Sequence, residues 1–169
     1  MTEGVDSLRK SVKLASGLRF RGYKTRRELA GESLSDNLTG LLNRNGWNQK
    51  VSEYLKHGER TGENVSFIFI DLDDLKTTND TKGHDAGDDI LKGFSKILTK
   101  IGRQSDLIAR YGGDEFTICL PATGLDEANK MKDRLLENAG DIKISVGIGT
   151  TLEDADNAMY KMKKLHKNG

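Results

Sequence analysis

The sequence predicts an α+β fold in which a central antiparallel sheet is flanked by helices. Three observations carry this prediction: an apolar run at 65–70, a two-glycine turn between two strand-like runs near 112, and helical periodicity between the predicted strands. From residue 65 onward the predicted order is strand, helix, hairpin, helix, strand, helix. That order is typical of a split βαβ, ferredoxin-like core, in which a helix joins two sheet strands on each side of a hairpin.

Each predicted element rests on its own pattern. Val65 to Ile70 has the apolar character of a central strand covered on both faces. Asp88 to Ile101 repeats apolar residues at helical spacing, which predicts an amphipathic helix. The hairpin strands are expected at 107–111 and 116–120, further helices at 37–54, 125–137 and 154–165, and a last strand at 142–148.

Length and composition fit one soluble globular domain with a short appendage. The chain has 169 residues, of which 35% are hydrophobic and 31% are charged. No apolar run approaches the roughly 18 residues that a membrane helix requires, and the N-terminus lacks the apolar core of a signal peptide. We therefore expect a cytoplasmic protein without a membrane segment. The single cysteine, Cys119, falls in a predicted strand and is expected to be a small buried residue.

The charge distribution suggests a domain boundary near residue 34. Residues 1–33 hold eight basic and four acidic side chains, a net charge of +4, so the rest of the chain carries −3 of the overall +1. We interpret 1–33 as a basic extension and 34–169 as the main domain. The extension is open to three interpretations: a solvated or partly disordered segment, a docking or dimerising helix, or, least favoured, a nucleic-acid-binding arm.

Two adjacent carboxylates on the predicted hairpin turn are the most informative residues. Gly112 and Gly113 allow the backbone to approach a ligand closely, and Asp114 and Glu115 supply the hard oxygen ligands that Mg²⁺ prefers. On its own, Gly-Gly-Asp is equally typical of an ordinary acidic turn.

Further carboxylates follow the first predicted strand. Asp71 and Asp73 come where the apolar run ends, and the two-residue period of a strand places them on the same side. If that strand neighbours the hairpin in the sheet, Asp71 and Asp114 can converge on shared Mg²⁺, as nucleotide-transfer sites require. Taken alone, such acids are also common turn residues and helix caps.

Four motifs follow one another along the chain: Asp36–Arg44, Phe69–Asp80, Gly83–Asp88 and Gly112–Phe116. Together they resemble the GGDEF-domain diguanylate cyclases. The resemblance covers about 34–168 and implies a nucleotidyl-cyclase palm that joins two GTP molecules into cyclic di-GMP and releases two pyrophosphates. It also implies Mg²⁺ or Mn²⁺ as the metal and a homodimer in which each protomer brings one GTP.

The resemblance also implies site residues. Asp71 and Asp114 would bind the metal together with the Leu72 carbonyl, and Glu115 would lie beside them as a third catalytic residue. Asn79 and Asp88 would read guanine, whose edges an amide and a carboxylate complement. The other implied GTP contacts are Leu38 and Leu75 at the base, and Lys76, Lys163, Lys167, Gly112 and Gly113 at the phosphates.

The chain departs from the family pattern near its C-terminus. The usual Gly-Arg-Asn-like run after the lysine is absent, and Lys167 stands where an arginine is common. Lysine keeps the positive charge but loses the planar fork that binds phosphate with two hydrogen bonds. Asn45 departs from the usual Asn-Arg-Arg motif at a position for which we expect no catalytic role.

A second site is suggested by Arg103 and Asp106. Their spacing ahead of Gly112 matches the family's product-inhibition motif, and arginine offers a fork to phosphate or guanine. Arg134 on the following helix is a further candidate from a second subunit. The alternative is a surface salt bridge in the loop after a helix.

Two other functions stay open at this stage. One is a catalytically silent receptor for cyclic di-GMP or GTP; the acids at 71, 114 and 115 speak against it, because a receptor needs no metal pair. The other is a cyclase making a mixed or adenine-containing dinucleotide, against which Asp88 argues by complementing the donor edge of guanine.

Overall fold

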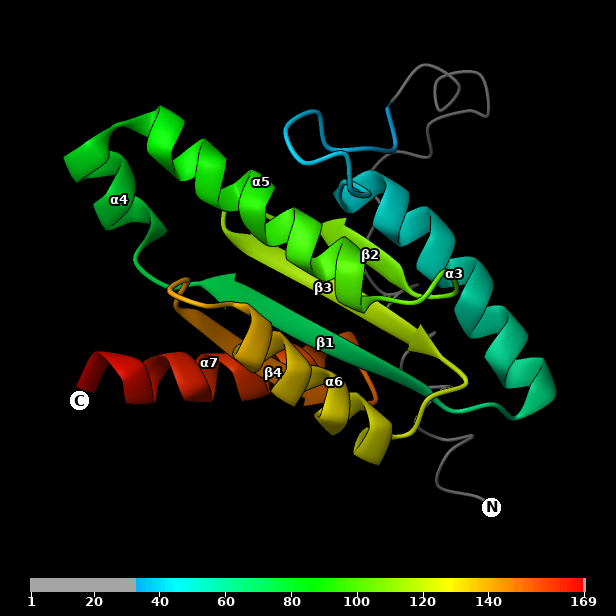
Figure 1. Ribbon diagram of the computed structural model, residues 1–169. Helices are drawn as coiled ribbons and strands as arrows, with labels where there is room; N and C mark the ends of the chain where they lie inside the picture. Colours follow the sequence, from blue (N-terminus) through cyan, green and yellow to red (C-terminus); the bar gives the residue numbers. More distant parts are fainter. Residues whose placement is uncertain (1–32, 169) are drawn as a thin grey trace.

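The sheet has the predicted topology, with the first strand at its centre. The computed structural model describes residues 33–168, so the predicted basic extension lies outside the described residues except for Ser33. The four antiparallel strands lie in the order β2-β3-β1-β4 (Figure 1). Their bounds are β1 Val65–Leu72, β2 Leu107–Arg110, β3 Glu115–Pro121 and β4 Ile144–Gly149. All eight residues of β1 are buried, as predicted for a doubly covered strand.

Residues 33–168 form five helices beside the sheet. They are α3 (Arg44–Thr61), α4 (Leu75–Lys82), α5 (His84–Ile101), α6 (Leu125–Asn138) and α7 (Leu152–Asn168). Helices α5 and α6 lie over the face that is in front in Figure 1, where they pack on Ile68 and Ile70 of β1. The alternate residues Phe67 and Phe69 belong to the second core, with Trp47 of α3 and Met159 of α7. None of the described helices has the length and apolar character needed to cross a bilayer.

Three helix predictions need correction. The helix predicted at 37–54 begins only at Arg44, because the preceding segment forms a loop in which Gly40 has a φ of 75° and the Asn43 side chain caps Gly46 N–H at 2.9 Å. Helix α4 was not predicted, since only Leu75 of its eight residues is buried and it has no apolar period. Helix α5 starts at His84 rather than Asp88.

The loop before α3 extends the outer edge of the sheet. Leu42 pairs with Ala109 of β2 as an isolated parallel bridge. Leu42 N–H donates to Ile108 O at 3.2 Å, and Arg110 N–H donates to Leu42 O at 2.8 Å. The start of the described chain is thereby attached to the strand that leads into the Gly112–Gly113 turn.

Helix α7 rests directly on β4 because two glycines leave no side chain between them. A Cβ atom at Gly147 would coincide with backbone atoms of Ala155 and Met159, and one at Gly149 would press on Ala155 N. The backbone contact fixes the height and rotation of α7 over the sheet, and therefore the place where the side chains of its second half meet the end of β1.

We expect Gly147→Ala to destabilise the domain by about 1–3 kcal/mol, the usual cost of forcing a methyl group into a packed interior. Gly93→Ala on α5 is the matched control, since a Cβ there meets nothing within 4 Å; it should gain up to about 1 kcal/mol from helix propensity. Urea unfolding of both variants measures the difference. Equal stability of Gly147→Ala and the parent protein would contradict the direct contact of α7 with β4.

Candidate functional site

The register of β1 and β3 brings the predicted acids together. Asp71 pairs with Glu115 across the two strands, and Leu72 N–H donates to Asp114 O at 3.0 Å. The strand that carries Asp71 therefore does neighbour the hairpin, as its proposed convergence with Asp114 requires. Asp71 continues the alternation of Phe67 and Phe69, so it lies on the face covered by α7.

Lys163 of α7 supplies the positive charge nearest to Asp71. Its Nζ lies 2.6 Å from Asp71 Oδ1, and the Asp71 side chain is only 5% exposed. Burial raises the pKa of Asp71, as do the charges of Asp114 and Asp73, while Lys163 opposes the rise. Burial acts to lower the pKa of Lys163, but the hydrogen bond and charge of Asp71 outweigh it and the pKa rises. The buried carboxylate is thus held against a cation.

Negative charge is concentrated around Glu115 as well. Burial raises the pKa of Glu115, and the charges of Asp114, Asp71 and Asp156 of α7 raise it further. Three of these acids, Asp71, Glu115 and Asp156, border a pocket of about 650 Å³ between the end of the sheet and α7. Its walls are Asp71, Glu115, Asp156, Met159, Tyr160, Lys163, Lys164 and Lys167.

The donor set fits Mg²⁺ shared with a phosphate ligand. No group of three or more His, Cys, Asp or Glu side chains in residues 33–168 forms a closed metal cage. Mg²⁺ rarely uses such cages; one or two carboxylates, waters and substrate phosphates usually hold it. Two neighbouring carboxylates with mutual repulsion, Asp71 and Asp114, meet that requirement.

A second group of predicted residues lies where α4 meets α5. The Asn79 side chain is packed against Gly87, where any Cβ would coincide with its amide oxygen. That oxygen, Oδ1, is buried without a hydrogen-bond partner. Asp88 is the next residue after Gly87 and is half-buried, while Leu75 is buried and Leu38 packs on the same core. A buried amide oxygen without a partner is a candidate ligand contact.

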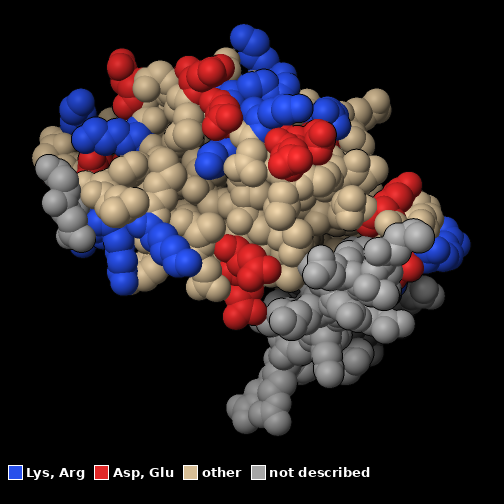
Figure 2. Space-filling view, turned by 90° about the horizontal axis from the view of Figure 1, so that it is seen from below, with Lys and Arg blue, Asp and Glu red and all other residues tan. Residues whose placement is uncertain are grey.

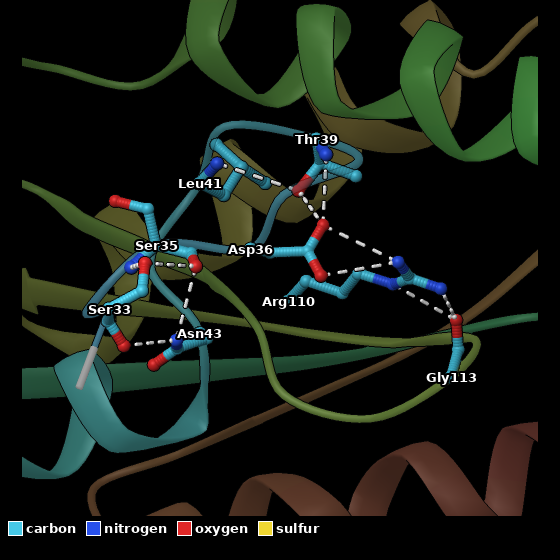
Figure 3. A network of polar contacts seen from close by, with 8 residues as sticks. All are labelled: Ser33, Ser35, Asp36, Thr39, Leu41, Asn43, Arg110 and Gly113. Atoms are coloured by element: carbon cyan, nitrogen blue, oxygen red, sulfur yellow. Dashed lines mark hydrogen bonds and ion pairs between the residues drawn. The ribbon is translucent and has the colours of Figure 1, made fainter.

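Arg110 fixes the turn from the side opposite to α7. Its Nε and Nη2 donate to Gly113 O at 3.1 and 2.7 Å, and its Nη1 donates to the Asp36 carboxylate at 3.3 and 3.4 Å (Figure 3). Thr39 adds two hydrogen bonds to Asp36, from N–H and Oγ1. Burial acts to raise the pKa of Asp36, but Thr39 and Arg110 together lower it. The loop before α3 thus holds the acidic turn through one guanidinium group.

Of the two turn glycines, Gly112 is required for space rather than for backbone conformation. Neither Gly112 nor Gly113 has a positive φ, unlike Gly40 and Gly62. A Cβ at Gly112 would instead collide with the carboxylate of Glu115, while one at Gly113 would meet nothing within 4 Å. Gly112 therefore makes room for Glu115 to fold back over the turn.

Comparison with known proteins places this site in a family. Residues 33–169 match the family model described as "Diguanylate cyclase, GGDEF domain". The chain belongs to the GGDEF family of diguanylate cyclases. This confirms the resemblance inferred from the four motifs, and the sheet confirms the cyclase palm fold.

Individual relatives agree with the family assignment. The GGDEF domain is 31% identical over 159 residues to the response regulator PleD of Caulobacter vibrioides, covering 80% of this chain and 35% of PleD. It is 33% identical over 157 residues to the diguanylate cyclase DgcP of Pseudomonas aeruginosa, covering 81% of this chain and 23% of DgcP. The chain therefore spans only about a quarter to a third of these two relatives.

A solved structure shows the same architecture. It is a microbial GGDEF domain described for its interaction with cyclic di-GMP; it is 31% identical, has a TM-score of 0.70, and the match covers 78% of this chain and 94% of the other.

The predicted inhibitory residues lie away from the α7 pocket. Arg103 and Asp106 form a turn after α5, in which Asp106 Oδ2 accepts from Arg103 N–H at 2.7 Å and Asp106 N–H donates to Arg103 O at 3.0 Å. The contact thus involves the Arg103 backbone. Arg134 is exposed on the neighbouring helix α6, where its guanidinium contacts Met131 Sδ at 3.3 Å.

Several residues of the GGDEF domain escaped the sequence analysis. Asp36 begins one of the quoted motifs and Arg110 lies in a predicted hairpin strand, and their opposite charges were the available signal for a pair. Lys164 directly follows Lys163 on α7, and Asp156 lies about two turns before Lys163 on the same helix. His166 is exposed, yet its Nδ1 lies 2.8 Å from Asp73 Oδ2.

The Asp36–Arg110 contact should stabilise the GGDEF domain measurably. The two side chains are 21% and 16% exposed, so we expect a coupling free energy of about 1 kcal/mol in a double-mutant cycle of Asp36→Ala and Arg110→Ala. The pair Asp89–Lys92 on α5 is the control; its side chains are 80% and 47% exposed, and its coupling should be near zero. Urea unfolding of the single and double variants measures both. Equal coupling in the two pairs would contradict a stabilising contact between Asp36 and Arg110.

Proposed function

We propose that this GGDEF domain is a diguanylate cyclase that converts two GTP molecules into cyclic di-GMP and two pyrophosphates. The observation that carries the proposal is the β1–β3 register, which sets Asp71 opposite Glu115 and brings Asp114 beside them. A buried group of several acids with a single lysine partner costs stability unless it binds a further cation, so the group supports a ligand that brings a metal ion.

The metal would be Mg²⁺ or Mn²⁺, because both accept oxygen ligands. Asp71, Asp114 and the Leu72 carbonyl would hold it. Such an ion neutralises charge on the phosphate oxygens and favours loss of the proton from the attacking hydroxyl. Glu115, whose pKa is raised by burial and by its acidic neighbours, could take up that proton.

The guanine base would lie at the junction of α4 and α5. The unpartnered Asn79 Oδ1 can accept a hydrogen bond from the base. The Asp88 carboxylate can accept from the guanine N1–H and exocyclic amine, and would face an adenine acceptor unfavourably. Leu38 and Leu75 would line this base site from the core side.

The triphosphate would lie along the turn and the C-terminal half of α7. Lys163 already contacts Asp71 and Lys167 lines the same pocket, while Lys76 is the second residue of α4 and is exposed. Gly112 and Gly113 would let the turn approach the phosphates. Figure 2 shows basic side chains gathered where α7 ends, at the left of that view.

The reaction geometry implies a homodimer. In each half-reaction the 3′-oxygen of one GTP attacks the α-phosphorus of the other, a new P–O bond forms, and the bond to the β-phosphate breaks to release pyrophosphate. One domain with one GTP cannot present both partners in line, so two domains must face each other. Product bound at Arg103 and Asp106, with Arg134 from a second subunit, would inhibit by holding domains apart.

Replacing Asp114 tests the acid site. We expect Asp114→Ala to reduce cyclic di-GMP formation from GTP and Mg²⁺ by about a thousandfold or more, since it removes metal-linked stabilisation of the transition state. Asp89→Ala is the matched control, an exposed aspartate of α5 that should retain activity. Product is identified by mass after incubation with GTP and ATP together.

The outcomes separate the candidate functions. Full turnover by Asp114→Ala would contradict the site assignment, and a mixed dinucleotide in the parent protein would overturn the guanine assignment. A parent protein that binds cyclic di-GMP but forms no product at any protein concentration would instead identify a silent receptor.

A further inference from the structure

One polar cluster at the end of α7 has no part in the site described so far. His166 Nδ1 lies 2.8 Å from Asp73 Oδ2 and 3.2 Å from Ser145 Oγ. Ser145 Oγ in turn lies 2.9 and 3.0 Å from the two Asp73 carboxylate oxygens. Ser145 is fully buried, and the Asp73 side chain is 11% exposed. The three side chains join α7 to the ends of β1 and β4.

The chemistry of the cluster fixes which nitrogen donates. A carboxylate only accepts hydrogen bonds, so the contact with Asp73 requires a proton on Nδ1 of His166. The neutral tautomer protonated at Nδ1 and the imidazolium ion both meet this requirement. The tautomer protonated at Nε2 would place two acceptors 2.8 Å apart and would not bind.

This contact lies beside the ion pair of the acid site. Lys163 and His166 are three residues apart on α7 and so share one helix face, and they contact Asp71 and Asp73, which are two residues apart on β1. Met162 packs on the sheet core, but the helix continues beyond it. Of the side chains at 164–167, Leu165 is 73% exposed and Lys164 lies over Tyr160 of the same helix, so His166 alone ties this stretch to the sheet.

We propose that His166 is a positioning residue for the triphosphate site, which it serves by fastening the last turn of α7 to Asp73 and Ser145. The neighbouring Lys167 is exposed and lines the pocket, so the direction of its ammonium group depends on how firmly that turn is held. The same contact keeps the Asp73 carboxylate turned toward Ser145 and His166, beside the main chain of Leu72. The inference rests on the proposed function for its effect on GTP, but its structural part is independent of it.

The identity of the donor atom provides a sharp test. The side-chain nitrogen of asparagine can occupy the place of histidine Nδ1, whereas that of glutamine corresponds to Nε2. His166→Asn should therefore preserve the contact with Asp73, and His166→Gln and His166→Ala should lose it. Neither asparagine nor glutamine carries a positive charge. A difference between these two variants therefore reports the position of the donor nitrogen and not a direct charge contact of residue 166 with phosphate.

Steady-state kinetics with GTP and Mg²⁺ give the functional readout. We expect His166→Ala and His166→Gln to raise KM for GTP about tenfold, the factor that matches loss of one hydrogen bond to a charged group. Their kcat should stay within about twofold of the parent value, because the acids that act on the reacting atoms are retained. His166→Asn should stay within about twofold of the parent in both constants. An unchanged KM in His166→Ala, or loss in His166→Asn equal to that in His166→Gln, would overturn the proposal.

Two further measurements do not depend on cyclase activity. Nitrogen-15 spectra of labelled histidine should show a proton on Nδ1 of His166 in the parent protein. Hydrogen–deuterium exchange at 163–168 should be faster in His166→Ala and His166→Gln than in His166→Asn, with the thermal midpoint of each variant recorded as a folding control. If the parent protein makes no product but the spectra and the exchange rates come out as stated, the proposed function fails while the hydrogen bond between His166 and Asp73 is supported. An Nδ1 atom without a proton, or equal exchange at 163–168 in all variants, would contradict the hydrogen bond between His166 and Asp73.

Discussion

The end of β1 is the constraint on which the rest of the structure depends. There Asp71 lies between Glu115 of β3 and Ser145 of β4, on the face that α7 covers. Burial makes the Asp71 carboxylate unfavourable unless a positive charge is near, and Lys163 supplies it. Lys163 can reach Asp71 only if α7 lies close to the sheet. Gly147 allows this close approach, because it places no side chain between β4 and the backbone of α7.

The acidic turn is held from two directions. Arg110, paired with Asp36, connects Gly113 to the loop before α3. The hydrogen bond from Leu72 N–H to Asp114 O connects the turn to β1. The acids therefore cannot relieve their mutual repulsion by moving apart. Burial raises the pKa of Glu115, and the charges of its acidic neighbours raise it further. A rigid acidic group with one lysine partner is suited to a ligand that brings both cations and phosphates.

The sequence was sufficient for the sheet and the acids because both depend on short patterns. The apolar run at 65–70 predicted a buried central strand, and Asp71 and Asp114 were expected to converge if that strand neighboured the hairpin, as it does. Helix α4 could not be found this way, since it buries only Leu75. The loop before α3 was mistaken for helix because its leucines mimic helical spacing, although Gly40 adopts a left-handed conformation. The contact of His166 with Asp73 depends on the rotation of α7 over β4, which no local pattern specifies.

Anomalous diffraction from crystals grown with Mn²⁺ and a non-reactive GTP analogue tests the central claim most directly, because it locates the cation and the base in one experiment. The account predicts a Mn²⁺ peak between the carboxylates of Asp71 and Asp114, with the guanine against Asn79 and Asp88. A peak bound by other residues, or a guanine outside the junction of α4 and α5, would contradict it.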